Sequence, residues 1–230
     1  MRRIVVDIET CAYPLKSLSE SQREYILRYA EKEKNKDLRA EKIEESIRYL
    51  SLYPFTAKVI ALGIFDVEKE KAYVYYENNK SEEWESAGKS IHYKGAEEKE
   101  ILNAFWRLAE AADQIITFNG RGFDIPFMML RSAMHKIKVS RNLMTNRYDT
   151  SVHLDLLEQF TFFGLIKKFN LDFYCRSFGI ESPKSQGISG MEVKNLYEAG
   201  RIKEIAVYCG NDIIATYKLY KIWEDYLYVY

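Results

Sequence analysis

An apolar stretch near the start of the chain carries two carboxylates, and no other feature constrains the fold as strongly. The segment from Ile4 to Ile8 has the composition of a buried strand, yet Asp7 lies inside it and Glu9 directly follows it. Residues two apart in a strand point to the same face, so the two acids would project side by side and repel each other. An unpaired buried carboxylate is costly, so it takes up a proton or a partner. Two interpretations stay open: a divalent cation lies between the acids, or the strand runs out into solvent and the acids are hydrated.

The composition is that of one large globular domain. Hydrophobic residues make up 47% of the 230 residues, which is enough for a substantial core. Lys+Arg and Asp+Glu are both 34, so any electrostatic affinity for nucleic acid would need a local basic patch. The three cysteines match no zinc-binding spacing and indicate reduced thiols of a cytoplasmic protein. No apolar stretch approaches the roughly 20 residues of a membrane span, so we expect no membrane association.

The order of the predicted elements indicates an α/β domain with a mixed sheet. After the first strand, residues 16–54 are dense in Glu, Lys and Arg and predict one or two surface helices that form an insertion. Two β-rich segments separated by Val67–Glu70 predict a hairpin, and the polar residues 81–95 are expected to form a loop. The remaining predicted elements are helices at 96–112, 125–134, 165–178 and 202–228 and a short buried strand in QIITFNG (114–120).

Two further apolar segments each carry an acid. Asp124 follows the short strand and a glycine-rich turn, and Asp212 lies within the last predicted helix. Tyr208 lies about one turn before Asp212 and shares its helix face. Taken alone, each has an ordinary explanation: Asp124 caps a helix, Asp212 lies on the surface and Tyr208 belongs to the core. With the first strand, three apolar segments thus each carry an acid at a point where the core would border a cleft.

These motifs, in this order, resemble the DEDD superfamily of 3′→5′ exonucleases, which have a ribonuclease H-like fold. The motifs are D-x-E (Asp7 to Glu9), N-x-x-x-F-D (Asn119 to Asp124) and Y-x-x-x-D (Tyr208 to Asp212). The histidine branch of the superfamily would have His in place of Val207, so the chain resembles the tyrosine branch, which includes the proofreading domains of family B DNA polymerases. The segment KSQGISG, which begins at Lys184, adds to the resemblance. The resemblance implies one ribonuclease H-like domain over residues 1–230, with a mixed five-stranded sheet flanked by helices.

The resemblance also implies a two-metal phosphodiesterase that releases nucleoside 5′-monophosphates from a 3′ end. The ligands of the two Mg²⁺ or Mn²⁺ ions would be Asp7, Glu9, Asp124 and Asp212. Asp7 would bridge the ions, because it is expected to lie deepest in the strand. Tyr208 would orient the attacking water, since a phenol with a pKa near 10 is a poor base at neutral pH. Asp155 is expected to cap a helix or support the site from behind rather than to bind metal.

Several residues are candidates for contacts with the substrate. By their match to the family motifs, Thr10 and Asn119 would contact the terminal nucleotide. Phe123 either stacks on a base or packs in the core. Arg121 and Lys184 are candidates for contacts with phosphates.

The expected substrate is single-stranded DNA or a frayed 3′ end, or else RNA, because the sequence places no contact to a 2′-hydroxyl. Such an enzyme would serve DNA repair or proofreading in trans, and the oligomeric state is not predicted. The main alternative is a catalytically silent nucleic-acid-binding module of the same fold; the presence of all four acids favours the enzyme. A nuclease that cuts within strands is a third hypothesis, and the pairing of Tyr208 with Asp212 speaks against it.

Overall fold

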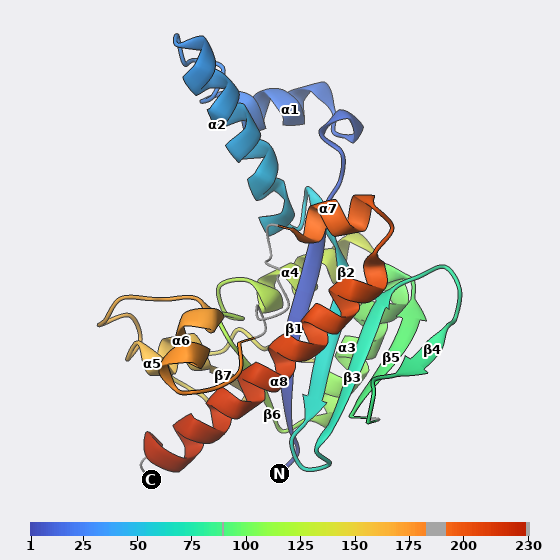
Figure 1. The fold of residues 1–230 in the computed structure, drawn as a ribbon, viewed down its shortest axis with the longest axis vertical. Helices are drawn as coiled ribbons and strands as arrows, with labels where there is room; N and C mark the ends of the chain where they lie inside the picture. Colours follow the sequence, from blue (N-terminus) through green and yellow to red (C-terminus); the bar gives the residue numbers. More distant parts are fainter. Residues whose placement is uncertain (89, 183–191, 229–230) are drawn as a thin grey trace.

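A seven-stranded mixed sheet in the order β4-β5-β3-β2-β1-β6-β7 forms the centre of the protein (Figure 1). The structure, a computed structural model, describes residues 1–88, 90–182 and 192–228. The strands are β1 (Arg3–Ala12), β2 (Ala57–Asp66), β3 (Lys71–Glu77), β4 (Glu83–Glu85), β5 (Ile91–Ala96), β6 (Gln114–Thr117) and β7 (His153–Asp155). β1 pairs antiparallel with β2 and parallel with β6, so it lies inside the sheet with neighbours on both sides.

Helices cover both faces of the sheet. The long helix α8 (Ile202–Tyr226) crosses one face diagonally, and α3 (Glu98–Ala111) and α4 (Asp124–Met134) lie on the other (Figure 1). Val5 packs in the cluster that includes α8, whereas its neighbours Ile4 and Val6 pack in the cluster that includes α3 and α4. This alternation along β1 is the strand period of two, and it places Asp7 and Glu9 on the side of α8.

A glycine allows α8 to approach the strands closely. Gly63 in β2 pairs with Asp7 in β1. A Cβ atom at Gly63 would lie 2.6 Å from Cγ2 of Ile213 and 3.0 Å from Sγ of Cys209, both in α8. Because position 63 has no side chain, α8 packs directly against the sheet beside Asp7.

A helical arm projects from the sheet between β1 and β2 (Figure 1). It consists of η1 (Leu15–Ser17), α1 (Glu20–Leu27), α2 (Lys36–Arg48) and η2 (Tyr49–Leu52). Ser19 and Gln22 form a capping box at the start of α1, and Asn35 caps α2 with its side-chain oxygen. Neither α1 nor α2 has a buried residue, which is why their sequences are so rich in charge. The charged helical insertion predicted after the first strand is confirmed.

The predicted α/β class and mixed sheet are confirmed, but the expected number of five strands was wrong. Residues 81–95 were expected to form a loop, and they contain β4 and most of β5. β5 pairs in parallel with β3, and β4 pairs with the outer side of β5. Stacking of Trp84 on Tyr93, with ring centroids 3.7 Å apart, holds these two short strands together. The polar composition of the segment hid the alternation of Ile91 and Tyr93, which are buried, with half-buried neighbours.

The helix predicted at 165–178 is shorter than expected. The structure has α6 (Leu171–Ser177), which begins after Asn170, whose side-chain oxygen accepts from the N–H of Phe173 at 3.0 Å. Gly164 and the two residues before it have positive φ angles, so a turn and not a helix precedes Asn170. The remaining helices are α5 (Leu156–Phe160) and α7 (Val193–Glu198). Among the described helices, none has both the length and the apolarity that crossing a bilayer requires.

Candidate active site

Three acids from the two ends of the sequence meet where α8 crosses β1. One carboxylate oxygen from each of Asp7, Glu9 and Asp212 lies within 4.8 Å of the other two. Asp7 and Glu9 project from the same side of β1, and Asp212 comes from the middle of α8, which the close contact at Gly63 brings to that side. Such a set of hard oxygen donors, carried on a strand and a long helix, fits a divalent cation.

Asp124 is hydrogen-bonded to β1 next to this group. It is the first residue of α4 and only 3% exposed, and its Oδ1 accepts the N–H of Ile8 at 3.0 Å. The helix N-cap is Phe123, without a side-chain hydrogen bond, so the interpretation of Asp124 as a helix cap is wrong. Asp124 instead fastens the start of α4 to the strand that carries Asp7 and Glu9. It also raises the pKa of both acids, so its charge acts on the group of three.

Burial and mutual repulsion raise the pKa values of these acids. Removal from water is the main cause for Asp7 and Glu9, whose pKa values lie well above the ordinary range, and the neighbouring carboxylates add to it. Burial raises the pKa of Asp124 to about 7. Asp7 lies in the middle of β1, as expected, but it is partly exposed, whereas Asp124 is buried. A divalent cation would reduce the repulsion among these carboxylates.

This repulsion predicts an unusual pH dependence for the metal-free protein. An acid whose pKa is higher in the folded state binds its proton more tightly there, so the stability that it contributes is lost as the pH rises toward the folded-state value. For Asp124 the window runs from its ordinary value of 3.8 to about 7, and the loss is on the order of 4 kcal/mol. Asp7 and Glu9 act in the same direction. Urea unfolding with a chelator should therefore show greater stability at pH 5 than at pH 8. Equal stability at both pH values would contradict the prediction, and Asp124→Asn should flatten the dependence.

Tyr208 lies in α8 one turn before Asp212. Its side chain is 7% exposed. Burial and the carboxylate of Asp212, to which it is hydrogen-bonded, raise the pKa of its hydroxyl far above the ordinary value. The hydroxyl therefore keeps its proton at neutral pH. Cys209 follows, and its Sγ lies 3.8 Å from the backbone oxygen of Asp7, which marks how closely the helix approaches the strand.

The residues predicted to contact substrate adjoin the acids in sequence or lie in the turn that leads to Asp124. The hydroxyl of Thr10 donates to the backbone oxygen of Ser51 at 2.7 Å, so it joins β1 to the helical arm. Asn119 begins the turn after β6, with a positive φ of 64°. Phe123 packs at the edge of the core on the α4 side, with its ring centroid 5.5 Å from that of Phe127. Their contacts with a nucleotide remain predictions.

A buried aspartate organises the turn that leads from β6 to Asp124. Asp155 accepts three backbone N–H groups: those of Asn119 and Leu157 on Oδ1, and that of Arg121 on Oδ2, all at 2.9–3.0 Å. It caps α5, and the expectation that Asp155 is a cap or a support for the site agrees with these contacts. The side chain of Arg121, a candidate for phosphate contact, donates to the backbone oxygen of Thr145 at 3.0 Å. Lys184 and the segment KSQGISG lie outside the described residues.

Replacing Asp155 with alanine should loosen this turn. Three buried N–H groups would lose their acceptor, and we expect a loss of about 2–3 kcal/mol in the free energy of unfolding. Because support residues behind a metal site orient its ligands, affinity for Mn²⁺ should fall by about 10–100-fold. Asp155→Asn keeps the oxygen that serves Asn119 and Leu157 and should give intermediate values. Urea unfolding and calorimetric titration with Mn²⁺ measure the two effects. Normal Mn²⁺ affinity in a destabilised alanine variant would contradict the claim that Asp155 orients the metal ligands.

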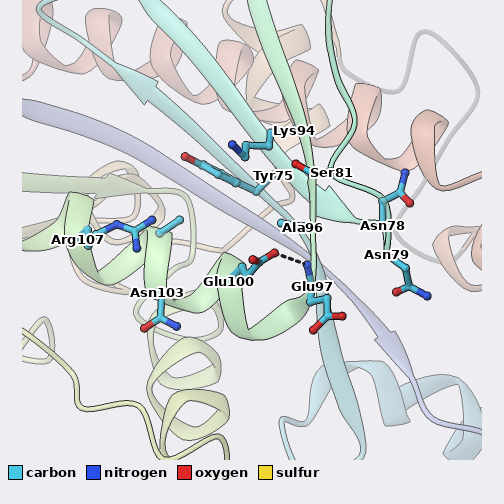
Figure 2. A pocket seen from close by; sticks show the side chains of 12 residues that line it. Tyr75, Asn78, Asn79, Ser81, Lys94, Ala96, Glu97, Glu100, Asn103 and Arg107 are labelled. Atoms are coloured by element: carbon cyan, nitrogen blue, oxygen red, sulfur yellow. Dashed lines mark hydrogen bonds between the residues drawn. The ribbon is translucent and has the colours of Figure 1, made fainter.

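The hollow shown in Figure 2 lies elsewhere, between α3 and strands β3 and β5. Its volume is about 620 Å³. The ring of Tyr75 lies between the side chains of Lys94 and Arg107, and Glu100 accepts the backbone N–H of Glu97 at 3.2 Å (Figure 2). None of the clustered acids lines it. Since its cations and acids balance and Lys94 already pairs with Glu83, this hollow is not the candidate active site.

Comparison with known proteins gives a family match and a structural likeness. A family model described as a predicted 3′-5′ exonuclease related to the exonuclease domain of PolB matches residues 77–225, which contain the second and third motifs. Among solved structures, the family B DNA polymerase from the hyperthermophilic archaeon Pyrobaculum calidifontis is similar, with a TM-score of 0.62 and 16% identity. The likeness covers 98% of this chain and 25% of the polymerase chain, and at this identity it shows the fold alone. No curated protein matches the chain.

Proposed function

The chain belongs to the family of predicted 3′-5′ exonucleases related to the exonuclease domain of PolB, and we propose that it is an active, metal-dependent 3′→5′ exonuclease. It removes nucleotides from the 3′ end of single-stranded nucleic acid, with DNA favoured over RNA. Water adds to the terminal phosphorus, the bond from phosphorus to the 3′-oxygen breaks, and a nucleoside 5′-monophosphate leaves. The single observation that carries the proposal is the meeting of Asp7, Glu9 and Asp212 within 4.8 Å, from segments some 200 residues apart.

The donor set favours two Mg²⁺ or Mn²⁺ ions as cofactors. Asp7, Glu9 and Asp212 would hold them, and Asp124, which is hydrogen-bonded to β1 at Ile8, would complete the set. Divalent cations at this position would lower the pKa of a bound water and balance the negative charge that the phosphodiester brings. Because the raised pKa values of Asp7 and Glu9 reflect repulsion and burial, binding of cations relieves an unfavourable feature of the metal-free protein.

Tyr208 positions the water and does not remove its proton. Its raised pKa keeps the hydroxyl neutral over the working range of pH, so the hydroxyl can donate or accept a hydrogen bond but is a weak base. Its place one turn from Asp212 holds it at the edge of the acid group. Thr10, Asn119 and Phe123 are proposed to contact the terminal nucleotide.

The alternative is a nucleic-acid-binding module without activity. All four acids and the tyrosine are present, and one oxygen from each of the three clustered acids lies within 4.8 Å of the other two, which favours the enzyme. The three cysteines of the chain are free and buried, which is typical of a protein in a reducing compartment. We therefore place the protein in the cytoplasm. We also propose that it acts in DNA repair or in proofreading in trans.

The test is a degradation assay with a single-stranded DNA oligonucleotide labelled at its 5′ end, in Mg²⁺ or Mn²⁺. We expect a ladder that shortens from the 3′ end and disappears with a chelator. The same assay with RNA measures the preference for the sugar. Tight binding without any degradation in either metal would support the silent module instead, and products cut from within the strand would support an endonuclease.

A further inference from the structure

The helical arm contains a groove lined by exposed aromatic side chains, which we call the tyrosine groove. It lies between α1 and the segment from η2 to β2 and has a volume of about 690 Å³. Its main lining residues are Tyr25, Tyr29, Tyr49, Tyr53, Phe55 and Arg28. The five aromatic side chains are between 44% and 68% exposed, although rings of this size are usually buried in a core. The arm lies outside the residues that the family model matches.

The groove combines aromatic faces with the cation of Arg28, and Lys32 and Arg48 each lie 5.9 Å from the ring centroid of one of its tyrosines, Tyr29 and Tyr49 respectively. The guanidinium of Arg28 lies 3.9 Å from the ring centroid of Tyr25 and 4.6 Å from that of Tyr29. None of the described residues that line the groove is acidic. Arg28 covers one face of the Tyr25 ring and one face of the Tyr29 ring, and the other aromatic faces of the groove are surfaces on which unpaired bases stack while the cation balances the phosphates.

The groove is connected to the acids of the candidate site. Leu50 and Thr56 line it, and the hydroxyl of Thr56 donates to the backbone oxygen of Leu50 at 2.6 Å. Ser51, next to Leu50, accepts the hydroxyl of Thr10, which directly follows Glu9 in β1. A strand with its 3′ end at the acids therefore has its preceding nucleotides within reach of the arm.

The charge of the chain explains why stacking is needed. The net charge is zero, and the candidate site itself is acidic, so the protein has no general electrostatic attraction for phosphates. Contacts with the bases would add affinity that does not depend on the net charge, and exposed tyrosines provide such contacts without sequence preference.

We propose that the tyrosine groove binds the bases of the single strand a few nucleotides upstream of the 3′ end that enters the site. This inference rests on the proposed exonuclease function and names the substrate contact that it requires. A double variant, Tyr25→Ala with Tyr29→Ala, should raise the KM for a (dT)20 oligonucleotide by about tenfold or more. Replacement of both by phenylalanine should keep the wild-type KM, since the rings remain. Tyr226→Ala is the matched control, because Tyr226 is 80% exposed at the far end of α8.

Two readouts separate failure of this inference from failure of the proposed function. The p-nitrophenyl ester of thymidine 5′-monophosphate is too short to reach the arm, so its hydrolysis should be the same in wild type and in both double variants. Photocrosslinking of (dT)20 that carries 5-iodouracil at single positions near the 3′ end does not depend on catalysis. We expect crosslinks to the tyrosines of the groove, found by mass spectrometry.

If wild type hydrolyses neither substrate, the exonuclease proposal fails, and the crosslinks still decide on the groove. Crosslinks confined to other surfaces, or an unchanged KM in the double alanine variant, would overturn the inference. That result would indicate a protein partner for the exposed aromatic face.

Discussion

Replacing Asp7 with asparagine is expected to lower exonuclease activity by about a thousandfold or more, which corresponds to about 4 kcal/mol of barrier. Asp7 contributes one of the three oxygens that lie within 4.8 Å of one another, and an amide is a poorer ligand for a divalent cation than a carboxylate. The same change should make the metal-free protein more stable, by about 1–3 kcal/mol, because it removes a buried acid that in the folded state must either take up a proton or carry its charge beside other carboxylates. Activity on the labelled oligonucleotide and urea unfolding with a chelator measure the two effects.

The opposite signs of these effects make the prediction specific to the acid group. A variant that merely damages the fold would lose both activity and stability. Wild type should gain stability on addition of Mn²⁺, about 2.7 kcal/mol when the metal exceeds its dissociation constant a hundredfold, and Asp7→Asn should gain much less. Glu41→Gln removes an exposed charge from α2 and should change neither quantity. If Asp7→Asn keeps a tenth of the activity, or destabilises the metal-free protein, the assignment of Asp7 as a ligand is wrong.

Much of the fold follows from local patterns in the sequence. Long apolar periodicities in the sequence predict β1, the hairpin of β2 and β3, α3 and α8. β4 and β5 were missed because their stability comes from non-local pairing of β5 with β3 and from the stacking of Trp84 on Tyr93, neither of which leaves a strong local signal. Only the alternation of Ile91 with Tyr93 could have revealed β5.

The position of each acid in the site could be predicted from the sequence to a different extent. The strand period alone placed Asp7 and Glu9 on one face. The approach of Asp212 depends on Gly63, whose missing side chain lets α8 reach the strand, and a glycine within a strand pattern does not say which helix approaches it. Likewise, the bond from Ile8 to Asp124 joins residues 116 apart in sequence, so local reasoning assigned Asp124 to a helix cap.

A buried ion pair that no local sequence pattern predicted holds α4 in place. Glu98, at the start of α3, accepts the N–H of Val59 at 2.9 Å and two N–H groups of Arg131, from Nε at 2.8 Å and Nη2 at 2.6 Å. Nε2 of His135 lies 2.9 Å from the same carboxylate. Arg131 is 3% exposed and comes from α4, the helix that begins with Asp124. The pair therefore fixes α4 against α3 and β2, and with α4 it fixes Asp124.

Replacing Glu98 with alanine should be the most destabilising single change at this position, with an expected loss of about 3–5 kcal/mol in the free energy of unfolding. The reason is that Arg131 would remain charged and buried without its partner, which costs far more than the pair itself contributes. Glu83→Gln offers a matched control, because Glu83 pairs with Lys94 at 2.7 Å but both side chains are more than 40% exposed. An exposed pair of this kind is worth about 1 kcal/mol or less. Urea unfolding compares the two variants, and a loss below 1 kcal/mol in Glu98→Ala would contradict the interpretation. If the pair positions Asp124 by fixing α4, Glu98→Ala should also weaken Mn²⁺ binding at temperatures where the variant stays folded. Glu83→Gln should bind Mn²⁺ like wild type.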